Sequence, residues 1–162
     1  SIGEGQARWL EDVLAANHAR YLAPDGTEVR GGGSDRLVFV FSHHTSTTMA
    51  ADDADPAHPS ERRLLGPEVV ALLVRYPNVV AWVNGHTHTN GIVAHRHPDD
   101  LASGFWEIST ASHVDWPQQA RILELVDNAD GTLSLFGTMI EHAGPTTPPT
   151  CSGWPRSLES WA

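Results

Sequence analysis

Two pairs of closely spaced histidines give this sequence its clearest chemical potential. His43 and His44 are adjacent, and His86 and His88 are separated by one residue in a Gly-His-Thr-His motif. Neutral imidazole is the commonest protein ligand of transition metals, and two rings on one rigid loop can bind an ion from one side. Taken alone, the second motif is also compatible with a surface turn or with two strand residues that share one face, and the first with a strand-end cap bound to backbone. Together, the two pairs favour a metal site.

Each histidine pair closely follows a short run of apolar residues. Residues 37–41 (LVFVF) precede Ser42 and the first pair, and residues 79–83 (VVAWV) precede Asn84-Gly85 and the second. Such runs are typical of buried strands, and the lack of alternation predicts that both faces of residues 37–41 are covered. Because open α/β sheets carry their sites at the carboxyl ends of parallel strands, we expect both pairs at one edge of a sheet.

The remaining patterns predict two helices and several further strands. Ser1-Ile2-Gly3-Glu4 has the form of a capping box, which would begin an amphipathic helix over residues 5–18. A second helix is predicted to begin at Gly66-Pro67 and to end before Tyr76-Pro77. Further strands are predicted over residues 92–97, 105–109, 122–126 and 132–136, the last two as a β-hairpin. This order indicates an α/β fold, a mixed β-sheet with flanking helices.

The chain is acidic, with a formal charge of −10 over 162 residues, which disfavours nucleic acid or an anionic membrane as its main partner. A phosphate-containing substrate stays compatible, because a bound metal supplies local positive charge. No apolar run is long enough to cross a bilayer, and the single Cys151 excludes an internal disulfide framework. The length suits one domain, which we place at residues 1–142, followed by a Pro/Thr-rich tail over residues 143–162. No feature indicates a cellular location.

The other histidines differ in how close they stand to these strands. His113 follows the predicted strand 105–109, so it is a candidate for the rim of the same pocket. Five others are interpreted as structural or solvated: His18, His58, His95, His97 and His142. No Ser-His-Asp arrangement and no phosphate-binding glycine loop stands out.

An apolar strand that ends in His-His, followed by one that ends in Gly-His-x-His, resembles the C-terminal half of the calcineurin-like metallophosphoesterases. The likeness covers most of the chain up to residue 142 and includes residues 6–11, 76–79, 105–110 and 116–119. It implies an α/β/β/α sandwich as the fold. It also implies that His43 and His86 bind the second of two metal ions and that His88 binds the first, with His44 beside them in the substrate pocket. The superfamily commonly has proline after the first pair, where this chain has Thr45.

The resemblance further implies phosphoester hydrolysis, of monoesters or diesters, by a metal-bound hydroxide with two ions of manganese, iron or zinc in the complete enzyme. The superfamily's other ligands come from Asp-x-His, Gly-Asp and Gly-Asn-His motifs, and none of these precedes Leu37 here. We therefore interpret the chain as a C-terminal segment that holds at most one ion, has no assigned catalytic residue and is inactive by itself. Such a segment would self-associate or bind the missing N-terminal half.

Two alternatives to this interpretation stay open. The chain could be a non-catalytic module that holds one metal ion, because three neutral histidines with an open position can bind a zinc-like ion. It could also be a structural domain whose histidines only satisfy backbone groups. Metal analysis separates the structural domain from the other two interpretations.

Overall fold

The computed structural model describes residues 1–98, 103–115 and 118–141 of the chain. The chain falls into two compact units, Ser1–Ala111 and Ser112–Ala162, which we call unit 1 and unit 2 and describe separately. The predicted boundary between a domain and a tail, at residues 142 and 143, lies outside the described residues.

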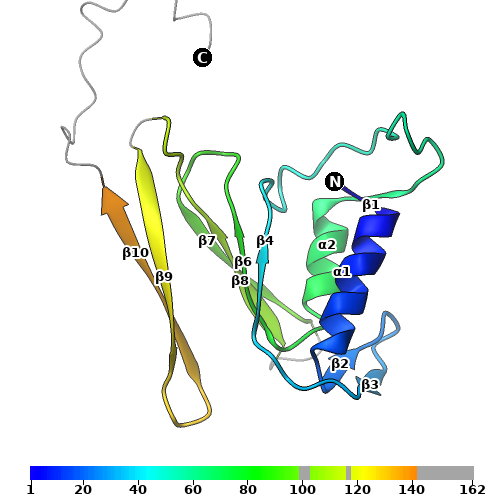
Figure 1. Ribbon diagram of the computed structural model, residues 1–162, viewed down its shortest axis with the longest axis horizontal. Coiled ribbons are helices and arrows are strands. Elements are labelled where there is room, and N and C mark those ends of the chain that lie inside the picture. Colours follow the sequence, from blue (N-terminus) through cyan, green and yellow to red (C-terminus); the bar gives the residue numbers. More distant parts are fainter. Residues whose placement is uncertain (99–102, 116–117, 142–162) are drawn as a thin grey trace, which may run out of the picture. The chain divides into compact units, whose positions relative to one another are not determined.

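Unit 1 is built on a mixed sheet of four strands with two helices on one side of it (Figure 1). In spatial order the strands are β4 (Val38–Phe41), β6 (Val79–Asn84), β8 (Gly104–Ser109) and β7 (Gly91–Arg96). β4, β6 and β8 run parallel, whereas β7 is antiparallel to β8. The four predicted strands are present with ends shifted by one residue. The chain is therefore of the mixed α/β class.

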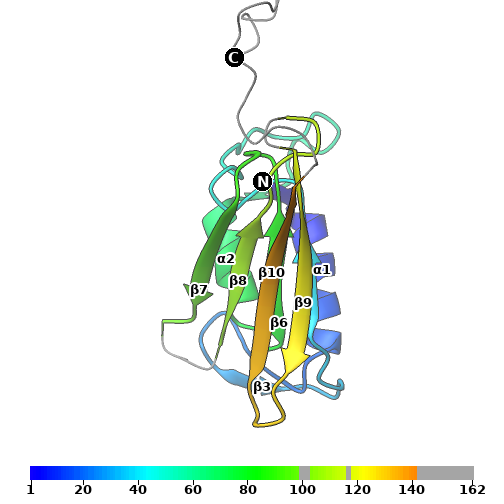
Figure 2. The same cartoon turned by 90° about the vertical axis from the view of Figure 1, so that its left-hand side faces the viewer.

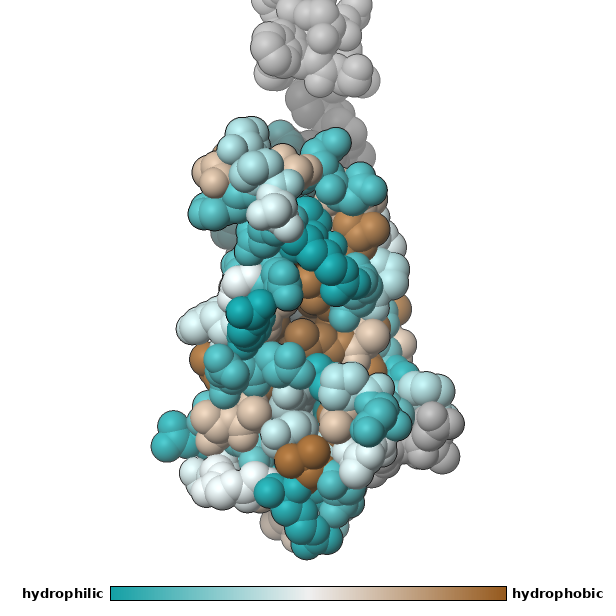
Figure 3. All heavy atoms as spheres, turned by 90° about the vertical axis from the view of Figure 1, so that its right-hand side faces the viewer, coloured by the Kyte–Doolittle hydropathy of each residue, from teal (hydrophilic) through white to brown (hydrophobic). Residues whose placement is uncertain are grey.

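The core of unit 1 lies between this sheet and the helices α1 (Glu4–Ala16) and α2 (Gly66–Leu73). Its largest fully buried side chains include Leu14 of α1, Leu73 of α2 and Trp82 of β6. Burying a leucine stabilises a fold by about 1.5–3 kcal/mol, so these contacts hold both helices against β6. Seen from the helix side, the surface is mostly hydrophilic with small apolar areas (Figure 3). Within the described ranges, no helix has the length and apolar character that a bilayer crossing requires.

The first helix begins differently from the predicted capping box. Its N-cap is Gly3, which has no side chain to accept a hydrogen bond from the first turn. Residues Ile2–Gly3 form a short strand, β1, which pairs antiparallel with β5 (Arg63–Leu64). Glu61 Oε1 accepts a hydrogen bond from the backbone N–H of Gly5, 2.8 Å away. The capping-box prediction is wrong because pairing with a distant segment already holds the residues before the helix.

A short hairpin that the sequence patterns did not predict follows α1. Its strands are β2 (Arg20–Leu22) and β3 (Glu28–Arg30), each of three residues. The turn is held by a hydrogen bond from the Thr27 N–H to Asp25 Oδ1 (2.9 Å), with Gly26 at φ = 84°. Three residues are too few to show the alternation that identifies a strand.

β4 lies at the edge of the sheet and has β6 as its one partner among the described strands. Phe41 is 71% exposed, and Leu37, just before the strand, is 51% exposed. The prediction that both faces of residues 37–41 are covered is therefore wrong for the described part of the chain. An unbroken apolar run is compatible with burial, but the neighbours that would bury it are set by the rest of the fold.

The described part of unit 2 contains one antiparallel hairpin (Figure 2). β9 (Gln119–Asp127) pairs over its whole length with β10 (Leu133–Glu141), and each strand has nine residues. The predicted hairpin is confirmed, although its strands are longer than the five residues predicted. Its turn includes Ala129 and Gly131, both with positive φ, as the Asn-Ala-Asp-Gly sequence suggests.

Candidate metal centre

The loops after β4 and β6 carry the two histidine pairs to the same edge of the unit 1 sheet. Because these strands are parallel neighbours, their carboxyl ends meet. Two backbone hydrogen bonds continue the pairing beyond the two strands. The Ser42 N–H donates to the Val83 carbonyl (3.1 Å), and the Gly85 N–H donates to the His43 carbonyl (3.0 Å). The structure thus joins the two histidine loops directly.

Three imidazole rings converge at this edge and form what we call the histidine cluster: His43, His44 and His86. His86 Nδ1 lies 3.0 Å from His43 Nε2, so a hydrogen bond forms when one of these nitrogens carries a proton. The ring centroids of His44 and His86 are 4.0 Å apart. One ligand atom from each of the three residues lies within 4.8 Å of the other two. Two of the rings are exposed and that of His44 is half-buried, so a ligand can reach the cluster from solvent.

The histidine cluster differs in one member from the ligand set that the family resemblance implies. His44, expected as a neighbour in the pocket, takes part in the cluster. His88 is exposed on the same loop as His86 and is not one of the three. His113 belongs to unit 2, where it is exposed in a bend before β9. The geometry therefore brings together three of the five candidate histidines.

The backbone of the second loop departs from an extended strand at both His86 and His88. In an extended strand, residues i and i+2 point to one face. Here φ is 63° at His86 and 53° at His88, in the left-handed region, so that alternation does not apply. A non-glycine residue in this region costs about 1–2 kcal/mol. Such strained residues concentrate at functional sites, where surrounding contacts hold them in place.

His44 is held by the turn that follows it. Its Nδ1 lies 3.3 Å from Thr48 Oγ1, which also accepts a hydrogen bond from the Thr45 N–H (2.9 Å). Desolvation lowers the pKa of His44, and the neighbouring His86 and His43 lower that pKa further. A ring held through one nitrogen presents the other in a defined direction, which is how metal-binding histidines are oriented.

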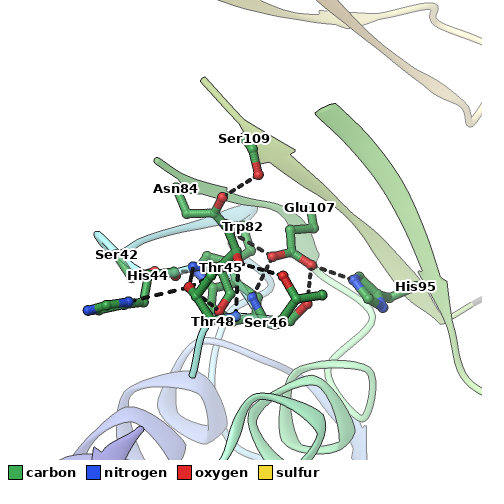
Figure 4. A network of polar contacts seen from close by, with 11 residues as sticks. Ser42, His44, Thr45, Ser46, Thr48, Trp82, Asn84, His95, Glu107 and Ser109 are labelled. Carbon is green, nitrogen blue, oxygen red and sulfur yellow. Dashed lines mark hydrogen bonds and ion pairs between the residues drawn. The ribbon is translucent and has the colours of Figure 1, made fainter. Parts of the chain in front are cut away.

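Further contacts tie the first loop to the rest of unit 1 (Figure 4). The Trp82 Nε1–H donates to Ser42 Oγ (2.7 Å), and this hydroxyl donates to the His44 carbonyl (2.7 Å). On the other side, the Gly66 N–H donates to the Met49 carbonyl (2.9 Å). The loop is therefore attached both to β6 and to the start of α2.

Glu107, which no sequence pattern singled out, lies at the centre of the polar network in Figure 4. Its side chain is 4% exposed on β8, and it accepts hydrogen bonds from Ser46, Asn84 and His95. Burial by itself raises the pKa of Glu107, but the hydrogen bonds from Ser46, His95 and Asn84 outweigh burial and hold the pKa below its usual range. The available signal was a lone carboxylate inside the strand sequence GFWEIS. The interpretation of His95 as structural agrees with its contact to this carboxylate.

The geometry of the histidine cluster suits one transition-metal ion. Three neutral imidazoles with an open fourth position are a ligand set of catalytic zinc sites. In a tetrahedral site with Zn–N distances of about 2.0–2.1 Å, neighbouring nitrogens lie about 3.3–3.4 Å apart. The 3.0 Å between His43 Nε2 and His86 Nδ1 and the 4.8 Å limit of the cluster bracket that spacing. The cluster contains no carboxylate, so it has no negative charge that would offset the repulsion between two metal ions.

A scan of the sequence against known protein families found no match, and neither did a search of curated proteins. The histidine cluster provides three nitrogen donors that solvent can reach. The loop that carries two of them is attached to the sheet by the hydrogen bond from the Ser46 N–H to Glu107. Such a set can bind a metal ion and leave a coordination position for a small ligand.

Proposed function

We propose that this chain binds one divalent transition-metal ion through His43, His44 and His86 and that the ion serves phosphoester hydrolysis. The observation that carries the proposal is the convergence of three imidazoles, from the ends of two neighbouring parallel strands, within 4.8 Å. The backbone hydrogen bond between the two loops supports it further, because it makes their proximity part of the fold.

The two histidine motifs resemble those of the calcineurin-like superfamily, and this resemblance supports the choice of reaction. It would place the mixed sheet of unit 1 in an α/β/β/α sandwich and make manganese, iron or zinc the metal. When bound, such an ion polarises a phosphoryl oxygen as a Lewis acid. The three histidines would hold it, with the ring of His44 fixed by Thr48. The exposed side of the cluster would stay open to the phosphoester.

Turnover would require groups that the described residues do not bring to the histidine cluster. No carboxylate belongs to the histidine cluster, and the Asp-x-His, Gly-Asp and Gly-Asn-His motifs do not precede Leu37. As the resemblance implies, a second ion and a group to assist the leaving oxygen would belong to the N-terminal half of the superfamily's domain. In this proposal the chain acts as the C-terminal part of a dinuclear enzyme.

A non-catalytic module that holds a single metal ion is the second candidate, and the neutral ligand set favours it. The two candidates differ in whether a longer protein that contains this chain and the N-terminal motifs turns over a phosphoester. In the hydrolase, that protein with Mn²⁺ would hydrolyse a chromogenic phosphodiester, and His86→Ala would abolish the turnover. In a non-catalytic module, hydrolysis would stay at the background rate.

Titration of the chain with Co²⁺ is expected to saturate at one equivalent, because three neutral donors suit one ion. With Mn²⁺ and a chromogenic phosphodiester, hydrolysis is expected to stay at the background rate. Visible absorption and a colorimetric assay measure these two results. Absence of binding at millimolar Co²⁺ would contradict the proposed site. Metal-dependent turnover that His86→Ala abolishes would contradict the assignment of the remaining catalytic groups to residues outside this chain.

We also propose that the open edge of β4 binds a second copy of the chain when the other half of the enzyme is missing. A strand edge without a partner offers backbone groups for pairing, and Phe41 at the end of β4 is 71% exposed.

Light scattering at micromolar concentration is expected to show species larger than a monomer, and Phe41→Lys is expected to shift them toward the monomer. Val114→Lys changes an exposed apolar residue outside any strand and serves as the control. A wild-type chain that stays monomeric would rule out this association.

A further inference from the structure

We propose that Glu107 is the positioning residue of the histidine cluster, and that its buried carboxylate holds both histidine loops in the arrangement that binds metal. This inference rests on the proposed metal-binding function and deepens it. The residue lies on β8, which carries no member of the cluster. Its influence would therefore pass through the backbone of the loops, and its side chain would not touch the ion.

The first histidine loop is attached to Glu107 at two points. Oε1 accepts a hydrogen bond from the Ser46 backbone N–H (2.7 Å), and Oε2 accepts one from the Ser46 hydroxyl (2.7 Å). Ser46 is separated from Glu107 by 61 positions in the sequence but lies only two residues after His44. Two bonds to one residue fix its orientation as well as its position, so the turn that follows the first histidine pair is clamped to the sheet.

The second histidine loop is attached to the same carboxylate through Asn84, the last residue of β6. Oε1 of Glu107 accepts a hydrogen bond from Asn84 Nδ2 (2.8 Å), and Asn84 lies two residues before His86. The other end of this amide is also used, because Ser109 Oγ donates to Asn84 Oδ1 (2.7 Å). The backbone carbonyl of Asn84 accepts the Thr110 N–H (3.0 Å). The residue from which the second loop departs is therefore held by both its side chain and its backbone.

The fourth contact completes the hydrogen bonding of the carboxylate. His95 Nε2 on β7 lies 2.7 Å from Oε2 and is the donor when Glu107 is ionised. Each carboxylate oxygen can accept two hydrogen bonds, and each oxygen of Glu107 here accepts two. One side chain thus joins β6, β7, β8 and the first histidine loop, as Figure 4 shows.

Replacement of Glu107 by leucine and by glutamine separates the hydrogen-bonding role from the charge. Leucine keeps an apolar volume of similar size but accepts no hydrogen bond, so both loops lose their common attachment. The glutamine carbonyl can still accept from the Ser46 N–H and from Asn84. Its amide N–H groups can donate to the Ser46 hydroxyl and to the other tautomer of His95. Glutamine should therefore preserve the positioning that leucine removes.

The test measures Co²⁺ affinity and amide hydrogen exchange on the folded chain. Glu107→Leu is expected to weaken Co²⁺ binding about tenfold, the lower end of the effect of supporting residues at metal sites. It should also speed exchange in residues 43–48 and 84–88. Glu107→Gln should stay close to wild type in both measurements. Leu72→Ala removes core volume on α2, which gives none of the four hydrogen bonds to the carboxylate, and it should lower stability while leaving the affinity of the folded chain unchanged.

A purely structural role for the carboxylate predicts a different pattern. If Glu107→Leu lowers stability but binds Co²⁺ like the wild type, and both loops exchange at wild-type rates, the inference is overturned. If the wild-type chain binds no Co²⁺, the proposed metal site fails, and exchange alone decides the positioning role: faster exchange in both loops supports it, and unchanged rates overturn it. If Glu107→Leu does not fold, Ser46→Ala replaces it, with affinity expected to fall about threefold through loss of one hydrogen bond. Unchanged affinity and exchange in Ser46→Ala would overturn the inference.

Discussion

Replacing His86 by alanine is expected to weaken Co²⁺ binding roughly 100-fold or more, since even residues that only support metal ligands are worth about 10–100-fold. His86 touches both other members of the cluster. Its Nδ1 lies 3.0 Å from His43 Nε2, and its ring centroid lies 4.0 Å from that of His44. Without His86, two donors from one loop remain. Structural zinc sites use four protein ligands and catalytic zinc sites use three, so two are too few for either. Isothermal titration of folded variants measures the loss.

Two further alanine variants show whether His44 or His88 is the third metal ligand beside His43 and His86. The cluster geometry predicts a large loss of affinity for His44→Ala and little change for His88→Ala. The reverse result would contradict that geometry and favour the ligand set implied by the family resemblance. His58→Ala is the matched control, because His58 is exposed in another loop, beside Asp55, and should leave the affinity unchanged. A loss in the control would point to scattered surface binding and not to one site.

Gly66→Ala is expected to destabilise unit 1 by about 1–3 kcal/mol, the usual cost of forcing extra atoms into a packed region. An added Cβ at this position would overlap the carbonyl oxygen of Ser46, and both groups belong to backbone that cannot move independently. The Gly66 N–H also donates to the Met49 carbonyl (2.9 Å), so a shift of α2 would pull on the loop. Because Ser46 is two residues from His44, Co²⁺ affinity should fall together with stability. Urea unfolding and Co²⁺ titration measure the two effects.

The control for this substitution is Gly91→Ala on β7. An added Cβ there meets nothing within 4 Å. Replacing an unstrained glycine by alanine restricts the unfolded chain and stabilises by about 0.4–1 kcal/mol. The two variants should therefore move the urea midpoint in opposite directions. If Gly66→Ala unfolds at the same urea concentration as Gly91→Ala, the loop adapts to the added methyl group and close contact at Gly66 is not required.

Local patterns in the amino-acid sequence were enough to predict most of the scaffold. Apolar runs at residues 37–41 and 79–83 correspond to β4 and β6, and the Asn-Ala-Asp-Gly turn corresponds to the β9–β10 hairpin. These features depend on periodicity and turn chemistry within a few residues, which a single sequence displays directly. The meeting of His43 and His86 also follows from pattern, because residues placed just after neighbouring parallel strands share one sheet edge.

The composition of the cluster and the way it is held depended on tertiary structure. Periodicity does not reveal the left-handed backbone at His86 and His88, where the side-chain alternation of an extended strand does not apply. Periodicity also does not reveal that Glu107 accepts hydrogen bonds from Ser46, which lies 61 positions away in the sequence. The partners of a carboxylate in an apolar strand are brought to it only when the chain folds. The exposure of Phe41 has the same origin, because whether an apolar strand lies inside a sheet or at its edge is decided by which other strands pair with it.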